Sequence, residues 1–235
     1  MKKREMQSLY TDEYLRAYDL LTTISPPYQE LRDAHIKFIL DNTSAGDWIL
    51  DFGAGTGNVT CELLKHNRCV MAIDVNSHMI KWLKNKCSIF DKKSYKIKRG
   101  DLLKMHLSSN MFSGITAMNV LYQIEEGYHE KYCREFVRIC RKGASVAFSG
   151  PHKGISAQQL RELIFKDISE ENKSKYAKEI KIITDSQKVL VENPKHSLIS
   201  DQELVHLMKK VGFTRIAKDD TFYNGLNYFI TAHKK

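Results

Sequence analysis

The sequence predicts an α/β fold, in which a mostly parallel sheet is covered by helices on both faces. Short apolar runs suited to buried strands alternate along the chain with amphipathic stretches of helical period. A glycine-rich segment, residues 53–57, comes directly after the first apolar run. Glycines after a strand let the backbone approach a ligand closely and turn into a helix, so this segment marks the expected binding site.

The composition agrees with a folded domain. The 235 residues are 42% hydrophobic and 28% charged, which suits one large domain at about 100–200 residues per domain. Apolar runs are far shorter than the roughly 20 residues needed to cross a bilayer, so no membrane association is expected. The first residues lack the apolar stretch of a secretory signal, and the five cysteines form no CxxC pair. We therefore expect a cytoplasmic protein with free thiols and no metal site.

The first half of the chain alternates between helices and strands. The expected elements are a helix over 28–42, a strand over 48–52, a helix over 58–65, a strand over 69–73 that ends at Asp74, and a helix over 77–87. Strands over 95–99, 114–121 and 144–149 follow, with a helix over 129–139 before the last of them.

The C-terminal segment is expected to add a helix and the last two strands of the sheet. Ser200 and Glu203 have the spacing of a capping box and open a helix that Gly212 ends. Two final strands, 214–218 and 226–232, leave no room for a helix between them, so we expect an antiparallel hairpin.

The domain organisation follows from where this alternation holds. Residues 151–199 do not fit it, but Ser156 and Gln159 again have capping-box spacing and open a helical stretch. Such an insertion after the fifth strand lies where open α/β sheets bind ligands, so it should cover the cleft as a lid. We expect one domain, 1–235, made of an N-terminal helical cap (1–45), a Rossmann-like core (46–150 and 200–235) and a helical lid insertion (151–199).

The glycine-rich loop is the most informative motif. Its spacing is G-x-G-x-G, whereas a dinucleotide fold uses G-x-G-x-x-G, which disfavours a nicotinamide oxidoreductase. Asp51 stands two positions before the first glycine. This combination resembles motif I of the class I S-adenosylmethionine-dependent methyltransferases. The resemblance implies a doubly wound, Rossmann-like seven-stranded sheet whose last strand is antiparallel.

Residues at the ends of the next strands fit the same family. Asp74 ends the second strand, where the family's acid holds the ribose hydroxyls of S-adenosyl-L-methionine. Asp101 matches the acid that meets the adenine amino group, and the segment around Asn119 matches the one beneath the methionine moiety. S-adenosyl-L-homocysteine would be the product. The resemblance implies these cofactor-binding residues: Asp51, Gly53, Ala54, Gly55, Gly57, Asp74, Val75, Met79, Asp101, Leu102, Asn119 and Val120.

Three residues are candidates for a catalytic role. Methyl transfer from a sulfonium is an in-line displacement, which needs a base only if the nucleophile carries a proton. Tyr18 resembles a tyrosine that covers the active site in related small-molecule methyltransferases, with a packing role as the alternative. Tyr122 follows the fourth strand, where many relatives carry histidines. His152 follows the fifth strand and titrates in the useful range, or is an ordinary loop histidine.

The charge distribution leaves the partner open. The net charge is +9, and residues 81–104 carry nine basic residues against Asp91 and Asp101. This stretch suits a polyanion or is a lysine-rich solvated surface. We predict methyl transfer to a nitrogen or oxygen atom of a small-molecule metabolite, by a monomer or homodimer. The alternatives are an RNA or protein methyltransferase on the same fold and a noncatalytic S-adenosylmethionine-binding protein.

Overall fold

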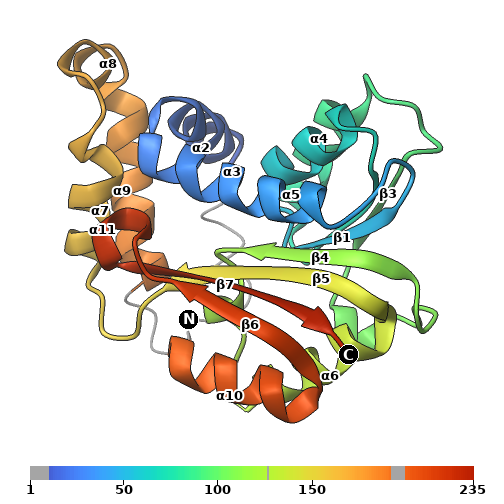
Figure 1. The fold of residues 1–235 in the computed structure, drawn as a ribbon. Helices are drawn as coiled ribbons and strands as arrows, with labels where there is room; N and C mark the ends of the chain where they lie inside the picture. The colour runs from blue at the N-terminus through green and yellow to red at the C-terminus, as the bar shows by residue number, and fades with distance from the viewer. Residues whose placement is uncertain (1–10, 126, 192–198) are drawn as a thin grey trace.

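Seven strands form one mixed sheet in the order β3-β2-β1-β4-β5-β7-β6 (Figure 1). The computed structural model describes residues 11–125, 127–191 and 199–235. β7 runs antiparallel to both β5 and β6, whereas the other neighbours are parallel. The predicted fold class and final hairpin are therefore confirmed. The strands are β1 (Trp48–Phe52), β2 (Cys69–Asp74), β3 (Tyr95–Arg99), β4 (Phe112–Met118), β5 (Cys140–Pro151), β6 (Phe213–Asp219) and β7 (Asn227–Lys234).

Helices cover both faces of this sheet (Figure 1). One face carries α3 (Pro26–Asp41), α4 (Asn58–Lys65) and α5 (Ser77–Cys87), and the other carries α6 (His129–Ile139) and α10 (Asp201–Val211). The cap contributes α2 (Asp12–Ile24) as well as α3. The described part of the lid insertion is helical and consists of α7 (Ala157–Lys166), α8 (Glu170–Lys175) and α9 (Ala177–Val191). A four-residue turn, α11 (Phe222–Gly225), joins β6 to β7.

Burial on both faces explains why the strands are nearly continuous apolar runs. Ile49 packs toward α3 and α4, whereas its neighbour Leu50 packs on the opposite side with Phe136 of α6 and Leu204 of α10. Successive strand residues point to opposite faces of the sheet. A strand with helices on both faces therefore needs apolar residues at successive positions and not only at alternate ones. None of the described helices combines the length and the apolar character that a bilayer span requires.

One expected boundary is wrong. The fourth strand was expected to reach residue 121, but β4 ends at Met118. Asn119 has φ +54°, which leaves the extended region, and its N–H donates to the carbonyl of Ser149 at 3.1 Å. A one-turn 3₁₀ helix, Leu121–Gln123, follows. The apolar run continues past the strand, so hydrophobicity marks burial here and not extended backbone.

The α2 helix is fixed over the core by a polar network. The indole N–H of Trp82 donates to the carboxylate of Asp19 at 2.5 Å, and Lys86 lies 3.2 Å from the same oxygen. Lys86 also donates to Asn58, whose amide donates to Thr22 on α2. These contacts join the cap to α4 and α5, the two helices that follow β1 and β2.

The cap and the lid insertion also contact each other. Ser25, between α2 and α3, donates its buried hydroxyl to the carbonyl of Ile164 at 3.1 Å. Lys178 on α9 pairs with Glu13 on α2 at 2.8 Å. The buried side chains of Leu15, Leu21 and Ile183 belong to one apolar cluster between these helices. Two segments far apart in the sequence therefore form one covering layer.

We expect Asp19→Ala to lower the free energy of unfolding by about 1–3 kcal/mol, since it leaves Trp82 and Lys86 without their acceptor. Asp33→Ala is the matched control, because Asp33 is 64% exposed in its pair with Arg32. The control should change stability by less than about 0.5 kcal/mol. Urea denaturation of both variants measures the difference, and equal stabilities would contradict this account of the cap.

Candidate functional site

A cavity of about 750 Å³ lies at the carboxyl ends of the strands, beneath the cap and the lid insertion. Its floor comes from the segments that follow β1, β2, β3 and β4, and from the start of β7. Its other walls come from α2, the start of α3, α7 and α9. This is where open α/β sheets bind ligands, because the loops of neighbouring strands diverge there.

The glycine loop forms one wall of this cavity. The N–H groups of Gly53 and Ala54 both donate to the carbonyl of Ile73, at 2.8 and 3.0 Å, which holds the loop against β2. A Cβ on Gly53 would lie 2.3 Å from Val120. A Cβ on Gly55 would meet nothing closer than 4.0 Å, although its φ of +52° still favours glycine. Gly53 is therefore required by packing, and Gly55 leaves its space open to a ligand.

Asp74 joins this loop to the next one. Its carboxylate accepts the N–H of Gly55 at 2.9 Å and the N–H of Asn76 at 2.8 Å. Burial raises the pKa of this carboxyl above its usual range, although hydrogen bonds from the backbone of Asn76, Gly55 and Val75 oppose the shift. The same carboxylate borders the cavity. Each oxygen has a further lone pair for a ligand hydroxyl.

The side of the cavity next to β2 and β3 is charged. Asp101 accepts the N–H of Leu103 at 3.0 Å and the hydroxyl of Tyr132 at 2.7 Å, both through Oδ1. Among the described residues that border the cavity, the charged ones are Asp74, Arg99, Asp101 and Lys104, all at the ends of β2 and β3 or just beyond. We refer to this side as the charged end.

Five tyrosines also border the cavity, and two of them, Tyr18 and Tyr28, border the small adjoining cavity beside the glycine loop as well. We refer to the part of the lining that contains Tyr14, Tyr18, Tyr28, Tyr122 and Tyr223 as the tyrosine end. Tyr18 stacks on Tyr14 with a centroid distance of 6.1 Å and meets Tyr28 edge-on at 6.2 Å. Burial raises the pKa of all five phenols. They are therefore neutral at physiological pH. The hydroxyls of Tyr28 and Tyr122 accept hydrogen bonds from the amides of Asn58 and Gln123, at 3.2 and 3.3 Å.

Most of the cofactor-binding residues expected from sequence come together here. Those that border the cavity are Gly53, Gly55, Asp74, Val75, Met79, Asp101, Asn119 and Val120. Asp51 and Ala54 instead border a small adjoining cavity of about 40 Å³. Leu102 is fully buried in the core, and Gly57 begins α4 with a left-handed φ of +89°. These four do not line the main cavity.

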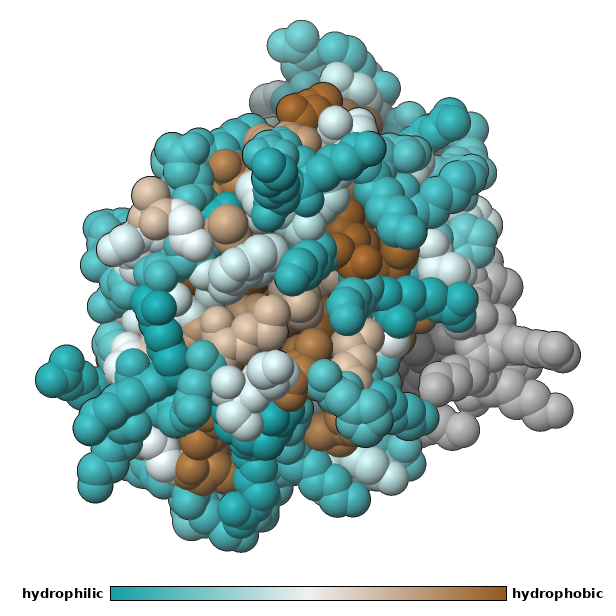
Figure 2. Space-filling view, turned by 90° about the vertical axis from the view of Figure 1, so that its right-hand side faces the viewer, coloured by the Kyte–Doolittle hydropathy of each residue, from teal (hydrophilic) through white to brown (hydrophobic). Residues whose placement is uncertain are grey.

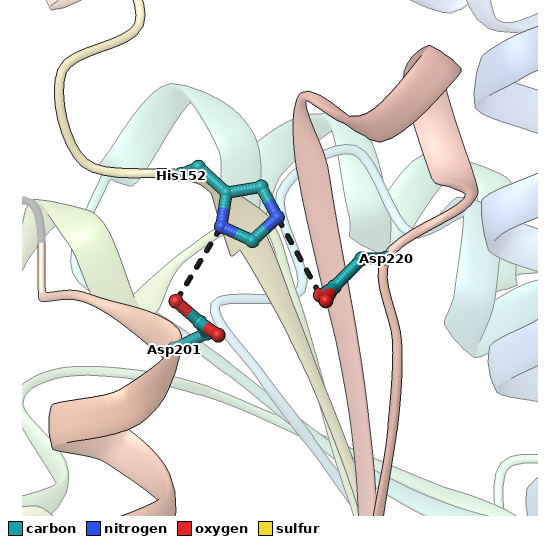
Figure 3. Close-up of side chains that lie close together, drawn as sticks. All are labelled: His152, Asp201 and Asp220. Atoms are coloured by element: carbon teal, nitrogen blue, oxygen red, sulfur yellow. Dashed lines mark ion pairs between the residues drawn. The ribbon is translucent and has the colours of Figure 1, made fainter.

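The three candidate catalytic residues do not lie in one place. Tyr18 and Tyr122 border the tyrosine end. His152 lies elsewhere, between Asp201 and Asp220, with each ring nitrogen 3.5 Å from a carboxylate oxygen (Figure 3). Its position after the fifth strand is as expected, but its imidazole is not among the described groups that line the cavity.

The His152 cluster has the composition of a metal site, but Lys218 supplies its positive charge. The ammonium group of Lys218 lies 2.5 Å from Asp201 and 2.6 Å from Asp220. An ammonium ion between two carboxylates occupies the position that a cation would need. We interpret the cluster as an ion-pair network that joins the start of the lid insertion to α10 and to the β6–β7 connection.

The cavity residues that were missed from sequence include Tyr14, Tyr223 and Asn227. Tyr14 lies one helical turn before Tyr18, and this spacing could have revealed it. Tyr223 and Asn224 both have φ near +50°, a conformation that L residues rarely adopt, and Tyr223 is only 5% exposed. Asn227 begins β7 and is 1% exposed. No local pattern marks Tyr223 or Asn227, since their place depends on the pairing of β7 with β5.

The basic stretch lies mainly outside the cavity. Lys86 holds Asp19, and Lys96 lies 4.9 Å from the centre of the Trp48 ring. Figure 2 views the molecule from the right-hand side of Figure 1, where β3 lies, and hydrophilic side chains cover most of this face. The stretch is therefore part of a solvated surface, with Arg99 and Lys104 at the cavity.

Comparison with known proteins agrees with this geometry. Residues 49–143 match the family described as a methyltransferase domain. The chain is similar in structure to phosphoethanolamine N-methyltransferase 2 of Haemonchus contortus in complex with S-adenosyl-L-methionine, with a TM-score of 0.70 and 16% identity over 96% of this chain and 57% of that one. Residues 49–143 thus resemble a methyltransferase domain in sequence, and the chain shares the fold of a methyltransferase that binds S-adenosyl-L-methionine.

The curated relatives match parts of this chain. A methyltransferase of undefined substrate from Anoxybacillus flavithermus is 27% identical over 105 residues, which are 45% of this chain and 47% of that protein. Demethylmenaquinone methyltransferase of Tropheryma whipplei is 32% identical over 75 residues, or 31% of each chain. The match spans about half the length, or less, of these relatives.

We expect Gly57→Ala to destabilise the protein more than Gly46→Ala. Both glycines have left-handed φ values, +89° and +81°, which cost an L residue roughly 1–2 kcal/mol. A Cβ at Gly57 would lie 2.2 Å from Leu83, whereas one at Gly46 would meet nothing within 4 Å. The steric contact should add about 1–3 kcal/mol to the cost of Gly57→Ala. Thermal unfolding of both variants tests this, and equal losses would contradict it.

We expect Asp51→Asn to remove a pH dependence of stability. Burial raises the pKa of Asp51 from 3.8 to about 7, even though Thr60 donates to it at 2.5 Å. The unfolded chain loses this proton at lower pH, so stability falls as pH rises from about 4 to about 7. An asparagine keeps the Thr60 contact without this penalty, which reaches roughly 4 kcal/mol at about 1.4 kcal/mol per pKa unit.

Urea denaturation at about pH 4.5 and about pH 8 measures the Asp51 effect as the change in unfolding free energy between the two pH values. Asp41→Asn is the control, since its carboxylate forms an exposed pair with Lys37. The same pH-dependent change in Asp51→Asn and the unaltered protein would show that Asp51 ionises normally.

Proposed function

We propose that this methyltransferase transfers the methyl group of S-adenosyl-L-methionine to a nitrogen or oxygen atom of a small-molecule metabolite. The observation that carries the proposal is the large cavity, which is bordered both by the charged residues after β2 and β3 and by five tyrosines. Its volume of about 750 Å³ lies within the range of about 300–1,000 Å³ that is usual for small-molecule sites. A cofactor and a small acceptor would share this space beneath the helices.

The residues of the charged end fit the cofactor. Asp74 has lone pairs available for both ribose hydroxyls, and Asp101 would accept the adenine amino group. The open space at Gly55 allows the ligand to approach the backbone. The cofactor, when bound, supplies an electrophilic methyl group on a sulfonium. Asn119 and Val120, after β4, would border its methionine part.

The chain's own contribution to the reaction is alignment and exclusion of water. The cap and lid insertion cover the tyrosine end, where Tyr18 and Tyr122 border the acceptor's space. Their raised pKa values favour neutral phenols, so we assign them orientation of the acceptor and not proton removal. Holding two reactants in line contributes up to about 7–11 kcal/mol to catalysis. His152, outside the cavity, has no role in the proposed transfer.

The alternative acceptors are less well supported. An RNA or protein substrate would have to present its target to a cavity that the cap and lid insertion cover. The basic stretch favours a polyanion by charge, but most of its lysines lie away from the cavity. In a structure of the Haemonchus contortus enzyme, the bound molecules are phosphomonomethylethanolamine and S-adenosylhomocysteine, which supports a small acceptor for this fold.

We expect calorimetry to detect binding of S-adenosyl-L-methionine and S-adenosyl-L-homocysteine, and Asp74→Ala to weaken both by at least about tenfold, equivalent to about 1.4 kcal/mol. The same substitution at Asp41, whose carboxylate is exposed, should leave both affinities unchanged. Absence of binding to the unaltered protein would overturn the cofactor assignment.

A second measurement addresses the acceptor. Transfer of a radiolabelled methyl group into a metabolite extract should give labelled small molecules, whereas labelled RNA or protein would favour the alternatives. Binding to RNA that falls steeply with added salt would also favour the RNA alternative. Cofactor binding with no labelled product in any fraction would favour a noncatalytic role.

A further inference from the structure

We propose that Tyr28 donates a hydrogen bond to the carboxylate of the cofactor's methionine part, and that Asn58 and Lys86 fix the direction of this donor. The proposal rests on the function proposed above. It adds a residue of the cap that distinguishes S-adenosyl-L-methionine from an analogue without the carboxylate.

Tyr28 lies where the two cavities meet. It borders the main cavity and also the small adjoining cavity of about 40 Å³, which the glycine loop and Asn119 border as well. Tyr28 is only partly buried, so it keeps surface for contact with a ligand. A water molecule needs about 10–15 Å³, so the small cavity has room for a group of the size of a carboxylate.

The ammonium group of Lys86 fixes the orientation of the Asn58 amide. Lys86 donates to Oδ1 of Asn58 at 2.6 Å. An ammonium group has no lone pair, so only the oxygen of the amide can face it. Nδ2 of Asn58 therefore lies on the side of Thr22 and Tyr28, whose hydroxyl oxygens accept from it at 3.1 and 3.2 Å.

This orientation leaves Tyr28 its own proton to donate. Burial raises the pKa of Tyr28, and hydrogen bonds from Asn58 and Tyr18 oppose the shift. Two donors therefore already face the hydroxyl oxygen, which has two lone pairs. Because the raised pKa keeps the phenol protonated at neutral pH, its remaining capacity is that of an O–H donor. A ligand in the small cavity meets this donor.

The cofactor offers one group that matches such a donor. Its methionine part ends in an ammonium group, which can only donate, and a carboxylate, which can only accept. With the ribose at Asp74, the methionine part would pass beside Asn119, which borders both cavities. The carboxylate is therefore the cofactor group expected at Tyr28.

Positive charge acts on Tyr28 through hydrogen bonds. The described residues that border the small cavity include no lysine and no arginine. Lys86 donates to the amide that in turn donates to Tyr28, and successive hydrogen bonds of one direction polarise one another. The O–H of Tyr28 is therefore a stronger donor than that of an isolated phenol. The contact expected with the carboxylate is a hydrogen bond to a charged group and not an ion pair.

The first test compares two cofactors that differ in one group, S-adenosyl-L-methionine and decarboxylated S-adenosylmethionine. Both are titrated into the full chain by calorimetry, and displacement by S-adenosyl-L-homocysteine measures the weaker one. Tyr28→Phe keeps the ring without the hydroxyl. We expect it to weaken S-adenosyl-L-methionine at least about tenfold and the decarboxylated form less than about twofold, since only the carboxylate loses a hydrogen bond. Unchanged affinity for S-adenosyl-L-methionine, or equal weakening of both, would overturn the proposal.

A second variant, Asn58→Asp, tests the direction of the donors. An aspartate keeps an oxygen for Lys86 but offers Tyr28 an acceptor in place of a donor, so the phenol O–H turns away from the ligand. A carboxylate in the first turn of α4 suits the helix dipole, so the fold is retained. We expect S-adenosyl-L-methionine to bind at least about tenfold more weakly, and the decarboxylated form to bind no more weakly than before. Full affinity for S-adenosyl-L-methionine in this variant would overturn the assigned direction.

The matched controls make the same chemical changes at the surface. Tyr128→Phe removes a phenol hydroxyl from a residue that is 42% exposed, and Asn85→Asp changes an exposed amide of α5. Both controls should bind the two cofactors as the unaltered protein does. A tenfold loss in either control would show that the losses at Tyr28 and Asn58 are not specific, and would overturn the proposal.

The proposed function and this inference fail in different ways. Absence of S-adenosyl-L-methionine and S-adenosyl-L-homocysteine binding to the unaltered protein would overturn the proposed cofactor, and the proposed function with it. Binding that Asp74→Ala weakens and Tyr28→Phe does not would leave the proposed function in place and overturn this inference.

Discussion

The carboxylate of Asp74 is the contact on which the charged end of the cavity depends. It accepts an N–H from the glycine loop after β1 and another from the turn after β2, so one side chain fixes two loops. Both bonds come from backbone groups, which do not change with rotamer. The same burial that raises its pKa strengthens these bonds, since fewer water molecules compete for them. A loop with three glycines, flexible in isolation, thereby acquires one conformation.

The tyrosine end depends on a different arrangement, because its walls come from segments outside the alternating core. Asp19 fixes α2 to α5, while Ser25 and Glu13 join the cap to the lid insertion. An α/β core on its own would leave the carboxyl ends of β4 and β5 and the start of β7 open to water. The covering helices bury this part of the lining, and burial raises the pKa of its phenols. The core and the covering helices therefore give the two parts of the cavity linings of different polarity.

The sequence predicted the features that depend on neighbouring residues in the chain. The strand of Ile49 and Leu50, the capping boxes and the glycine loop each depend on a few consecutive residues, and all form as expected. Asn227 and Tyr223 were missed because their positions depend on the pairing of β7 and on a left-handed turn. His152 was placed correctly after β5, but its partner Asp201 lies 49 positions further along the chain. Residues that meet only through tertiary structure leave no periodic signal.

The lysines of β3 have a consequence for self-association. β3 is an edge strand, and its Lys96 and Lys98 are exposed. The free N–H and C=O groups of an edge are a template for pairing with another chain, but two such edges brought together would oppose rows of like charge. The lysines of β3, which would suit a polyanion, therefore also oppose pairing of this edge strand with the same strand of a second copy. A homodimer of this chain would have to form through a different surface.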